Sequence, residues 1–398
     1  MKVLVYAHSF VPNIGGAETY VMLLARGLAE RSGGRPGSAD DARGLDRVAV
    51  ATRAEAAGFD DVALPFGVVR RPGLRRLWRL IGDADVVHLA GPVLLPLALS
   101  LLRGKSVVVE HHGYQAICPN GLLFLEPKRS ACPGHFMARR YGKCLRCASA
   151  SAGWRKGFLK VLLTFPRRWL CTQVAANIGI TDHVSQRLGL PAAGTIYHGV
   201  PDREGGASRT PRPRQGRFTF AYVGRLVGEK GLPLLLQATA RLRDARNELH
   251  VAFIGDGPER RHLESMVRDL GLSDLVTFTG FLQGRALEGA LAGANAVVMP
   301  SVCEETAGLA AIEHMMRGRL VIAADIGGLG EVVGRAGLKF SAGDVAGLAA
   351  CMRRALKDPA LVTALGAKAR QRALEHFRQD RMVEEHLLLY STVCQERS

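Results

Sequence analysis

The stretch NAVVMPSVCEETAGLAAIEHMM, residues 295–316, decides the fold of this chain. Residues 295–299 are mostly apolar and are predicted to form a buried strand, which ends at Pro300 because proline cannot donate to a sheet ladder. Residues 308–316 have the spacing of a helix with its apolar side chains on one face. A strand, a tight turn and a helix place the turn at the carboxyl edge of a parallel sheet, where open α/β sheets bind ligands.

Two glutamates, Glu305 and Glu313, lie eight positions apart in this stretch. Ionised carboxylates only accept hydrogen bonds, so they suit a ligand rich in hydroxyl donors, such as a sugar or a ribose. The alternative is a solvated helix face, which is the usual interpretation of an isolated pair of glutamates. The residues around this pair are small or apolar, and this favours ligand binding.

Strands and helices alternate along the whole chain, which predicts parallel, doubly wound sheets. Residues 201–216 have the glycine, proline and arginine content of a linker. We therefore expect a first domain over 1–200, whose last strand is predicted at 195–198, and a second domain over 217–375. The final segment, 376–398, has a helical pattern.

Cations follow the first predicted strand of the second domain. That strand ends at Gly224, which leaves Arg225 and Lys230 in the following loop and at the next helix start. A forked guanidinium and a mobile ammonium at a helix N-terminus suit a diphosphate. Arginine and lysine in a loop are more often simply solvated, so their neighbours must decide between the two interpretations.

Two sites in the first domain also follow strands. Gly15 and Gly16 come after the first strand, where paired glycines let backbone N–H groups approach a phosphate, although ordinary turns use them as often. His112 follows a strand at residues 106–110, and a neutral imidazole there could bind a sugar hydroxyl. The neighbouring His111 is expected only to pack.

Residues 305–313 resemble the E-x7-E motif of the retaining glycosyltransferases of family 4, which have the GT-B fold. The stretches 15–18, 224–231 and 254–258 are similar to further elements of that family, and the resemblance spans nearly the whole chain. The chain departs from the family at Thr306 and Ala307, where glycine and phenylalanine are common.

The resemblance implies two Rossmann-like, doubly wound domains that face each other across a cleft, with the C-terminal helix crossing back to the first domain. It implies that Arg225 and Lys230 hold a nucleotide diphosphate, that Glu313 binds the ribose and that Glu305 binds the donor sugar. These cations, Glu305 and His112 are the expected catalytic residues. The other expected donor-binding residues are Gly15, Gly16, Gly224, Gly257, Phe281, Thr306, Ala307, Gly308 and Leu309.

Four of the eight cysteines lie in one basic insert, residues 118–147: Cys118, Cys132, Cys144 and Cys147. Four thiolates that include one C-x2-C pair can hold Zn²⁺ tetrahedrally. The alternatives are four reduced thiols or two labile pairs. A structural zinc ion is thus a possible cofactor, while the absence of an Asp-x-Asp element at a strand end predicts no catalytic divalent metal.

The positive charge is concentrated in the first half of the chain. Residues 1–200 hold 26 Lys and Arg against 13 Asp and Glu, a net +13 of the chain's +17. The stretches 70–80 and 154–163 mix cations with Trp, Leu and Phe, as do helices that lie on anionic membranes. Because the longest apolar run is too short to span a bilayer and no signal peptide is recognised, we expect a cytoplasmic protein with peripheral membrane contact.

These features predict a retaining glycosyltransferase that moves a sugar from a nucleotide-diphosphate donor to a saccharide or lipid-linked acceptor, in cell-envelope polysaccharide or glycolipid synthesis. A GT-B epimerase or phosphorylase is an alternative enzyme. A nucleic-acid binder is a different class, but it would need aromatics among its cations, and aromatics make up only 6% of the chain. We therefore expect no nucleic-acid partner.

Overall fold

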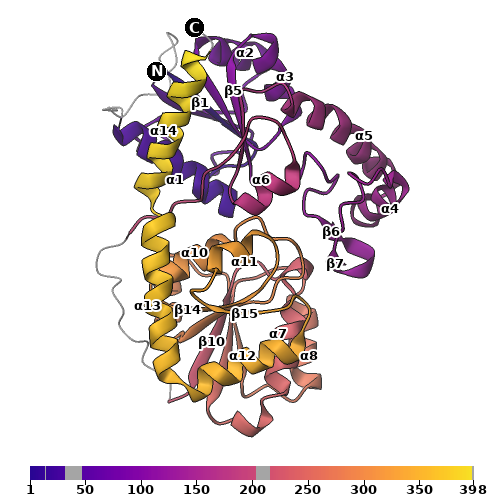
Figure 1. Ribbon diagram of the computed structural model, residues 1–398, viewed down its shortest axis with the longest axis vertical. Coiled ribbons are helices and arrows are strands. Elements are labelled where there is room, and N and C mark those ends of the chain that lie inside the picture. Colours follow the sequence, from indigo (N-terminus) through magenta and orange to yellow (C-terminus); the bar gives the residue numbers. More distant parts are fainter. Residues whose placement is uncertain (14, 32–46, 203–215, 397–398) are drawn as a thin grey trace. The chain divides into compact units, whose positions relative to one another are not determined.

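The computed structural model describes residues 1–13, 15–31, 47–202 and 216–396 (Figure 1). The chain forms two compact units. The first unit comprises residues 1–126, 133–201 and 378–398, and the second comprises 127–132 and 202–377. Most of the predicted linker, 203–215, lies outside the described residues.

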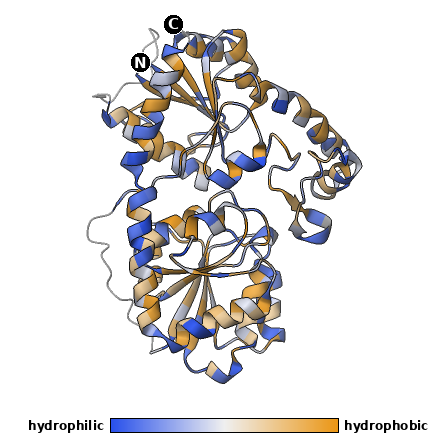
Figure 2. Ribbon diagram, in the orientation of Figure 1, coloured by the Kyte–Doolittle hydropathy of each residue, from blue (hydrophilic) through white to orange (hydrophobic). Residues whose placement is uncertain are grey.

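The first unit is built on a seven-stranded sheet in the order β3-β2-β1-β4-β5-β8-β9, and its strand pairs are parallel. Such a sheet is covered on both faces, which explains why strands such as β1 and β2 are almost entirely apolar (Figure 2). Its strands are β1 (Val3–Ala7), β2 (Val48–Thr52), β3 (Gly67–Arg70), β4 (Val86–Ala90), β5 (Ser106–His111), β8 (Ala176–Gly179) and β9 (Ala193–Thr195).

Helices connect these strands: α1 (Gly16–Arg31), α2 (Leu74–Asp83), α3 (Leu94–Leu102), α4 (Tyr141–Ala152), α5 (Trp154–Cys171) and α6 (Asp182–Leu188). The cysteine-bearing insert also contains the short elements β6 (Phe124–Leu125), η1 (Glu126–Lys128) and β7 (Ser130–Ala131).

The last helix, α14 (Gln379–Gln395), completes the first unit although it comes from the end of the chain (Figure 1). It lies against α1, where the Gln379 side chain donates to the Leu23 carbonyl over 2.9 Å. The Ser106 hydroxyl, at the start of β5, donates to the Val393 carbonyl over 3.0 Å. Met382, Val383 and other apolar residues of α14 are buried in the same core as β1.

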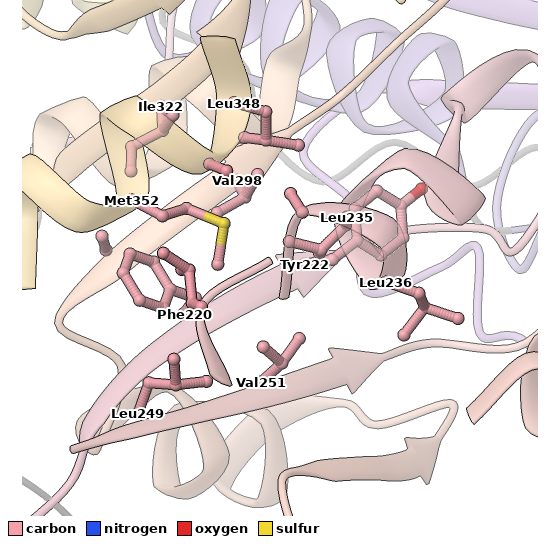
Figure 3. Close-up of a cluster of buried hydrophobic side chains, with 14 of the residues drawn as sticks. Phe220, Tyr222, Leu235, Leu236, Leu249, Val251, Val298, Ile322, Leu348 and Met352 are labelled. Atoms are coloured by element: carbon pink, nitrogen blue, oxygen red, sulfur yellow. The ribbon is translucent and has the colours of Figure 1, made fainter. Parts of the chain in front are cut away.

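The second unit is built on a six-stranded sheet in the order β12-β11-β10-β13-β14-β15, also with parallel pairs. Its core fills the space between the strands and the helices α7 and α12, where Phe220, Leu235 and Met352 meet (Figure 3). Its strands are β10 (Phe218–Val223), β11 (Leu249–Ile254), β12 (Val276–Gly280), β13 (Ala296–Met299), β14 (Leu320–Ala324) and β15 (Leu338–Phe340).

The helices of the second unit are α7 (Leu232–Ala240), α8 (Arg260–Asp269), α9 (Gly284–Ala292), α10 (Leu309–Met316), α11 (Gly327–Val333), α12 (Val345–Lys357) and α13 (Pro359–His376), with the 3-10 turns η2 (Gly228–Lys230) and η3 (Arg243–Ala245). The prediction of two parallel, doubly wound sheets is therefore confirmed.

Two local details differ from the sequence prediction. The strand expected at 195–198 ends at Thr195, because β9 is a short edge strand that pairs only with β8. Strands β3 and β15 were not predicted, since their four and three residues are too few to show a pattern. Among the described residues, no helix is both long and apolar enough to span a membrane.

The junction before α14 should be sensitive to any added side chain. A Cβ on the buried Gly199 would lie 2.6 Å from both the Arg378 carbonyl oxygen and Gln379 Cα, whereas a Cβ on the exposed Gly289 of α9 would meet nothing within 4 Å. We expect Gly199→Ala to destabilise the protein by about 1–3 kcal/mol through overpacking. Gly289→Ala should instead stabilise it by up to about 1 kcal/mol. Thermal unfolding checks both, and equal shifts for the two variants would contradict this account.

Candidate active site

The carboxyl edge of the six-stranded sheet carries most of the residues that were predicted to bind a ligand. One loop follows β10 and contains η2, and a second loop, residues 300–308, follows β13. Because β10 and β13 are neighbours in the sheet, these two loops lie side by side. The Val302 N–H donates to the Glu229 carbonyl over 3.0 Å and joins them.

An ion pair between Lys230 and Glu305 lies at the centre of this edge. Lys230 Nζ is 2.8 Å from Glu305 Oε1, and the Ser301 hydroxyl donates to the same oxygen. The Glu305 side chain is 7% exposed, whereas that of Lys230 is 27% exposed. An ammonium has three donors and Glu305 takes one, so Lys230 can donate further to a ligand at the open side.

Each partner keeps the other charged. Burial alone would raise the pKa of Glu305, but the Lys230 charge and the hydrogen bonds from Lys230 and Ser301 bring it below its ordinary value. Burial alone would lower the pKa of Lys230, but the Glu305 charge raises it. At neutral pH the site therefore holds a buried carboxylate and an ammonium, and neither is suited to give or take a proton.

Two glycines allow the loops to approach each other this closely. Gly231 has a φ of 63° in the left-handed region, and a Cβ there would overlap the Pro300 carbonyl oxygen. At Gly257, in the loop after β11, a Cβ would overlap the Leu226 carbonyl oxygen. A side chain at either position would separate the loop that holds Lys230 from its neighbours.

The other predicted residues of the second unit lie around this pair or near it in the chain. Arg225 has an exposed side chain in the loop after β10, and its carbonyl accepts a 2.7 Å hydrogen bond from the Tyr222 hydroxyl. Glu313 is half-buried on α10, and Phe281, after β12, is 55% exposed. Thr306, Ala307 and Gly308 form the turn into α10, which begins at Leu309, and Gly224 directly follows β10.

In the first unit, His112 directly follows β5, as predicted. Its Nδ1 is 3.1 Å from His198 Nε2, and its ring packs on that of Tyr20 with centroids 4.6 Å apart. Burial lowers the pKa of His112, so its imidazole is neutral near pH 7, as its expected role requires. Gly15 and Gly16 lie at the start of α1, in the loop after β1.

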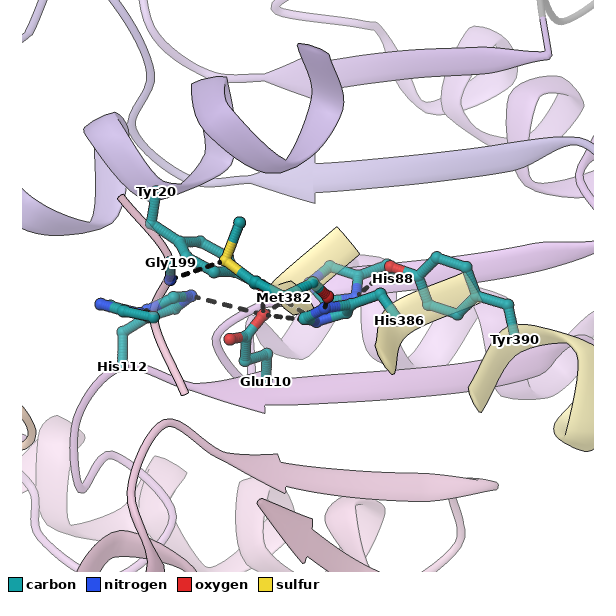
Figure 4. A network of polar contacts seen from close by, with 9 residues as sticks. Tyr20, His88, Glu110, His112, Gly199, Met382, His386 and Tyr390 are labelled. Carbon is teal, nitrogen blue, oxygen red and sulfur yellow. Dashed lines mark hydrogen bonds and ion pairs between the residues drawn. The ribbon is translucent and has the colours of Figure 1, made fainter. Parts of the chain in front are cut away.

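A buried polar cluster beside His112 was not predicted. Glu110 accepts a hydrogen bond from Tyr20 and lies among the imidazoles of His88, His386 and His112 (Figure 4). Burial alone would raise the pKa of Glu110, but His112, His386 and His88 lower it well below its ordinary range. A signal for part of this cluster was present, since His88 is the one polar residue of β4 and Glu110 follows three valines in β5.

The four cysteines of the insert are all buried. Cys144 and Cys147 lie one helical turn apart on α4, and the Cys147 thiol donates to the Phe124 carbonyl over 3.4 Å. Cys118 is in the loop after β5, and Cys132 follows β7. The zinc site stays a prediction.

Comparisons with known proteins agree with the predicted family. A model described as Glycosyltransferase Family 4 matches residues 14–203, and one described as Glycosyl transferases group 1 matches residues 217–358. The 2-deoxystreptamine glucosyltransferase of Streptomyces kanamyceticus is 34% identical over 220 residues, which are 51% of this chain and 57% of that protein. A glycogen synthase of Mycobacterium tuberculosis is 32% identical over 242 residues, 58% of this chain and 57% of that protein. The chain thus spans little more than half the length of these relatives.

Solved structures match over the whole chain, although at low identity. The Anabaena protein Alr3699/HepE in complex with UDP has a TM-score of 0.70 at 18% identity, and the match covers 98% of this chain and 100% of the other. Sucrose-phosphate synthase from Thermosynechococcus elongatus has a TM-score of 0.69 at 20% identity and 99% coverage of both chains. These likenesses show the fold.

The ion pair should make stability depend on pH. Since the pKa of Glu305 is lowered on folding, its charge stabilises the fold above the ordinary carboxyl pKa, and this contribution is lost as the pH falls through the lowered value. We expect Glu305→Gln to destabilise the protein by about 1–3 kcal/mol at pH 7 and by less in acid. Thermal unfolding across this pH range checks it. A constant difference at every pH would contradict the account. As a control, Glu248→Gln at an exposed glutamate should change stability little.

Proposed function

The chain belongs to the glycosyltransferases of family 4 and has the GT-B fold, as the resemblance implied; from this premise we propose that it moves a sugar from a nucleotide-diphosphate donor to an acceptor with retention of anomeric configuration. The observation that carries the proposal is the Lys230–Glu305 ion pair at the carboxyl edge of the second sheet. Alr3699/HepE has been solved with UDP and with UDP-glucose, which supports a nucleotide sugar as the ligand.

Lys230 would bind the diphosphate of the donor. Glu305 holds its ammonium in place before the ligand arrives, and at least one of its donors remains for a phosphate oxygen. A cation that is already positioned stabilises the charge that grows on the leaving diphosphate without further reorganisation. Arg225, exposed in the same loop, would add a second, forked contact to the phosphates.

Glu305 would bind hydroxyls of the donor sugar. Both of its hydrogen bonds reach Oε1, and among the described residues Oε2 accepts none. Oε2 can therefore accept from a sugar hydroxyl next to the diphosphate. Glu313, half-buried on α10, would bind the ribose.

The charge states favour a front-side reaction. A retaining enzyme with two carboxylates needs one of them to act first as an acid. Glu305 cannot do so near pH 7, because Lys230 and Ser301 lower its pKa. The departing phosphate would instead take the proton of the acceptor, while Lys230 and Arg225 stabilise its charge.

The proposal predicts that the ammonium of Lys230 is needed for transfer. We expect Lys230→Ala to lower the transfer rate by about 10²-fold or more, as does the loss of a preorganised charge partner in other enzymes. Lys357→Ala, which changes an exposed lysine at the end of α12, should leave the rate unchanged.

Two measurements accompany this comparison of variants. A thermal-shift screen with UDP-, GDP- and ADP-sugars identifies the donor, and NMR of the product gives the anomeric configuration. Equal rates for the two variants, or an inverted product, would refute the proposal.

We further propose that the first unit docks on an anionic membrane surface through α5, which suits a lipid-linked acceptor. Five large apolar side chains of α5 recur every three or four residues and are exposed: Trp154, Phe158, Leu162, Phe165 and Trp169. A neighbouring face of the helix, with Val161 and Thr164, is buried. Arg155 adjoins the stripe, with its guanidinium 5.5 Å from the centre of the Trp154 ring, as in helices that lie on anionic lipid.

The other basic stretch, residues 70–80, does not offer the same support. Most of it belongs to α2, whose Leu77 is buried together with Ile81, while the Trp78 ring is covered by the Arg103 guanidinium. The apolar side of α2 thus joins the core of the first unit, and α5 alone carries the membrane proposal.

Vesicle flotation tests this contact. We expect the wild type to float with anionic vesicles at low salt and less so at high salt. Leu162→Glu should weaken binding by about tenfold or more, since it loses the burial of one leucine in lipid, worth roughly 1.5–3 kcal/mol. Leu388→Glu adds the same charge at an exposed leucine on α14 and should change binding little. Equal loss in the two variants, or no flotation of the wild type, would contradict the membrane proposal and leave the transferase proposal standing.

A further inference from the structure

The buried cluster of the first unit joins the end of the chain to its sheet. Helix α14 contributes His386 and Tyr390, β4 contributes His88, β5 contributes Glu110, and α1 contributes Tyr20 (Figure 4). All five side chains are at most 1% exposed. So many polar groups in a dry core require a partner that satisfies them.

The two imidazoles turn their Nε2 atoms toward the same carboxylate. The Nδ1 of His386 lies 2.7 Å from the Met382 carbonyl, and the Nδ1 of His88 lies 2.9 Å from the Tyr390 hydroxyl. A carbonyl only accepts, so Nδ1 of His386 carries a hydrogen, and Nε2 of the neutral ring is a lone pair. Fixing one ring nitrogen in this way is how proteins orient histidines that bind a metal through the other nitrogen.

Hydrogen bonds among these groups do not satisfy them. His88 Nε2 lies 3.1 Å from Glu110 Oε2 but is not aligned to donate, and His386 Nε2 lies 3.5 Å from the same oxygen. The Tyr20 hydroxyl lies 3.0 Å from His386 Nε2 and also contacts Glu110 Oε2, but it can donate only one hydrogen and so can satisfy only one of the two. Among the described residues, Glu110 Oε1 has no hydrogen-bond partner, although it is fully buried. The lone pair on His386 Nε2 and those on the Glu110 carboxylate face each other at 3.5 Å and need a cation between them.

We propose that His88 Nε2, His386 Nε2 and the Glu110 carboxylate bind a structural divalent metal ion of the zinc class, which anchors α14 to β4 and β5. One ligand atom from each residue lies within 4.8 Å of the others. Ligand atoms that share a tetrahedral zinc ion are separated by roughly 3.3 Å, between the 3.1 and 3.5 Å seen here. The second Glu110 oxygen can complete the coordination, and the Tyr20 hydroxyl orients the carboxylate.

The alternative occupant is a proton, which would make one imidazole cationic. A proton bridges only two atoms, so it would leave either His88 Nε2 or Glu110 Oε1 unsatisfied, whereas a metal ion contacts all three residues.

Metal analysis of the full chain, purified without chelator or metal-affinity tag, tests the proposal. We expect the wild type and His262→Gln, a surface histidine of α8, to carry one equivalent of zinc more than either His88→Gln or His386→Gln. Comparing variants in this way cancels any zinc held by the cysteines. When cobalt replaces zinc, the visible absorption spectrum reports the ligands of each ion. The two variants should lose only the weak absorption bands of cobalt bound by nitrogen and oxygen, and should keep any intense band of cobalt bound by thiolates. Equal metal content in folded variants and wild type would overturn the proposal.

A second measurement uses the wild type alone, in case the variants fail to fold. In protein refolded with zinc, the backbone amides of α14 should be protected from hydrogen exchange. In protein refolded with a chelator, these amides should exchange about tenfold or more faster. Identical exchange of α14 in the two samples, which a proton-held cluster predicts, would overturn the proposal.

Discussion

The candidate site of the second unit is built around the Lys230–Glu305 ion pair. It joins the loop after β10 to the loop after β13, and the two loops meet only because Gly231 carries no side chain against Pro300. The pair also determines the charge states at this edge of the sheet. Although both groups are partly buried, the Lys230 charge keeps Glu305 ionised and the Glu305 charge keeps Lys230 protonated. Such a pair can bind an anion through the ammonium and hydroxyl groups through the carboxylate, but neither side chain is suited to transfer a proton near pH 7.

The first unit relies on a different constraint. This unit is completed by helix α14, which comes from the other end of the chain. The helix buries His386 and Tyr390 against β5 and β4. Polar groups in such a core are costly unless they satisfy one another or share an ion. The cluster around Glu110 adjoins His112, whose Nε2 lies 4.0 Å from Glu110 Oε2.

The two basic stretches of the first unit differ in whether their apolar side chains are buried or exposed. Both α2 and α5 combine cations with large apolar residues, and the sequence alone gave them the same interpretation. In the folded unit, α2 turns Leu77 and Ile81 inward, whereas α5 leaves Phe158 and Leu162 outside. The difference follows from what each helix packs on, which composition does not reveal.

The sequence by itself determined the two parallel sheets, the loops at their carboxyl edges and the identity of Lys230, Glu305 and His112 as candidates, because these depend on local patterns of strand, turn and helix. It predicted neither β3, which is too short to show a pattern, nor the grouping of Tyr20, Glu110 and His386. Only the tertiary structure decided that grouping, because these residues are separated by up to 366 positions and no local pattern links them. It also decided that Lys230 and Glu305 pair directly, since that contact requires β10 and β13 to be neighbours in the sheet.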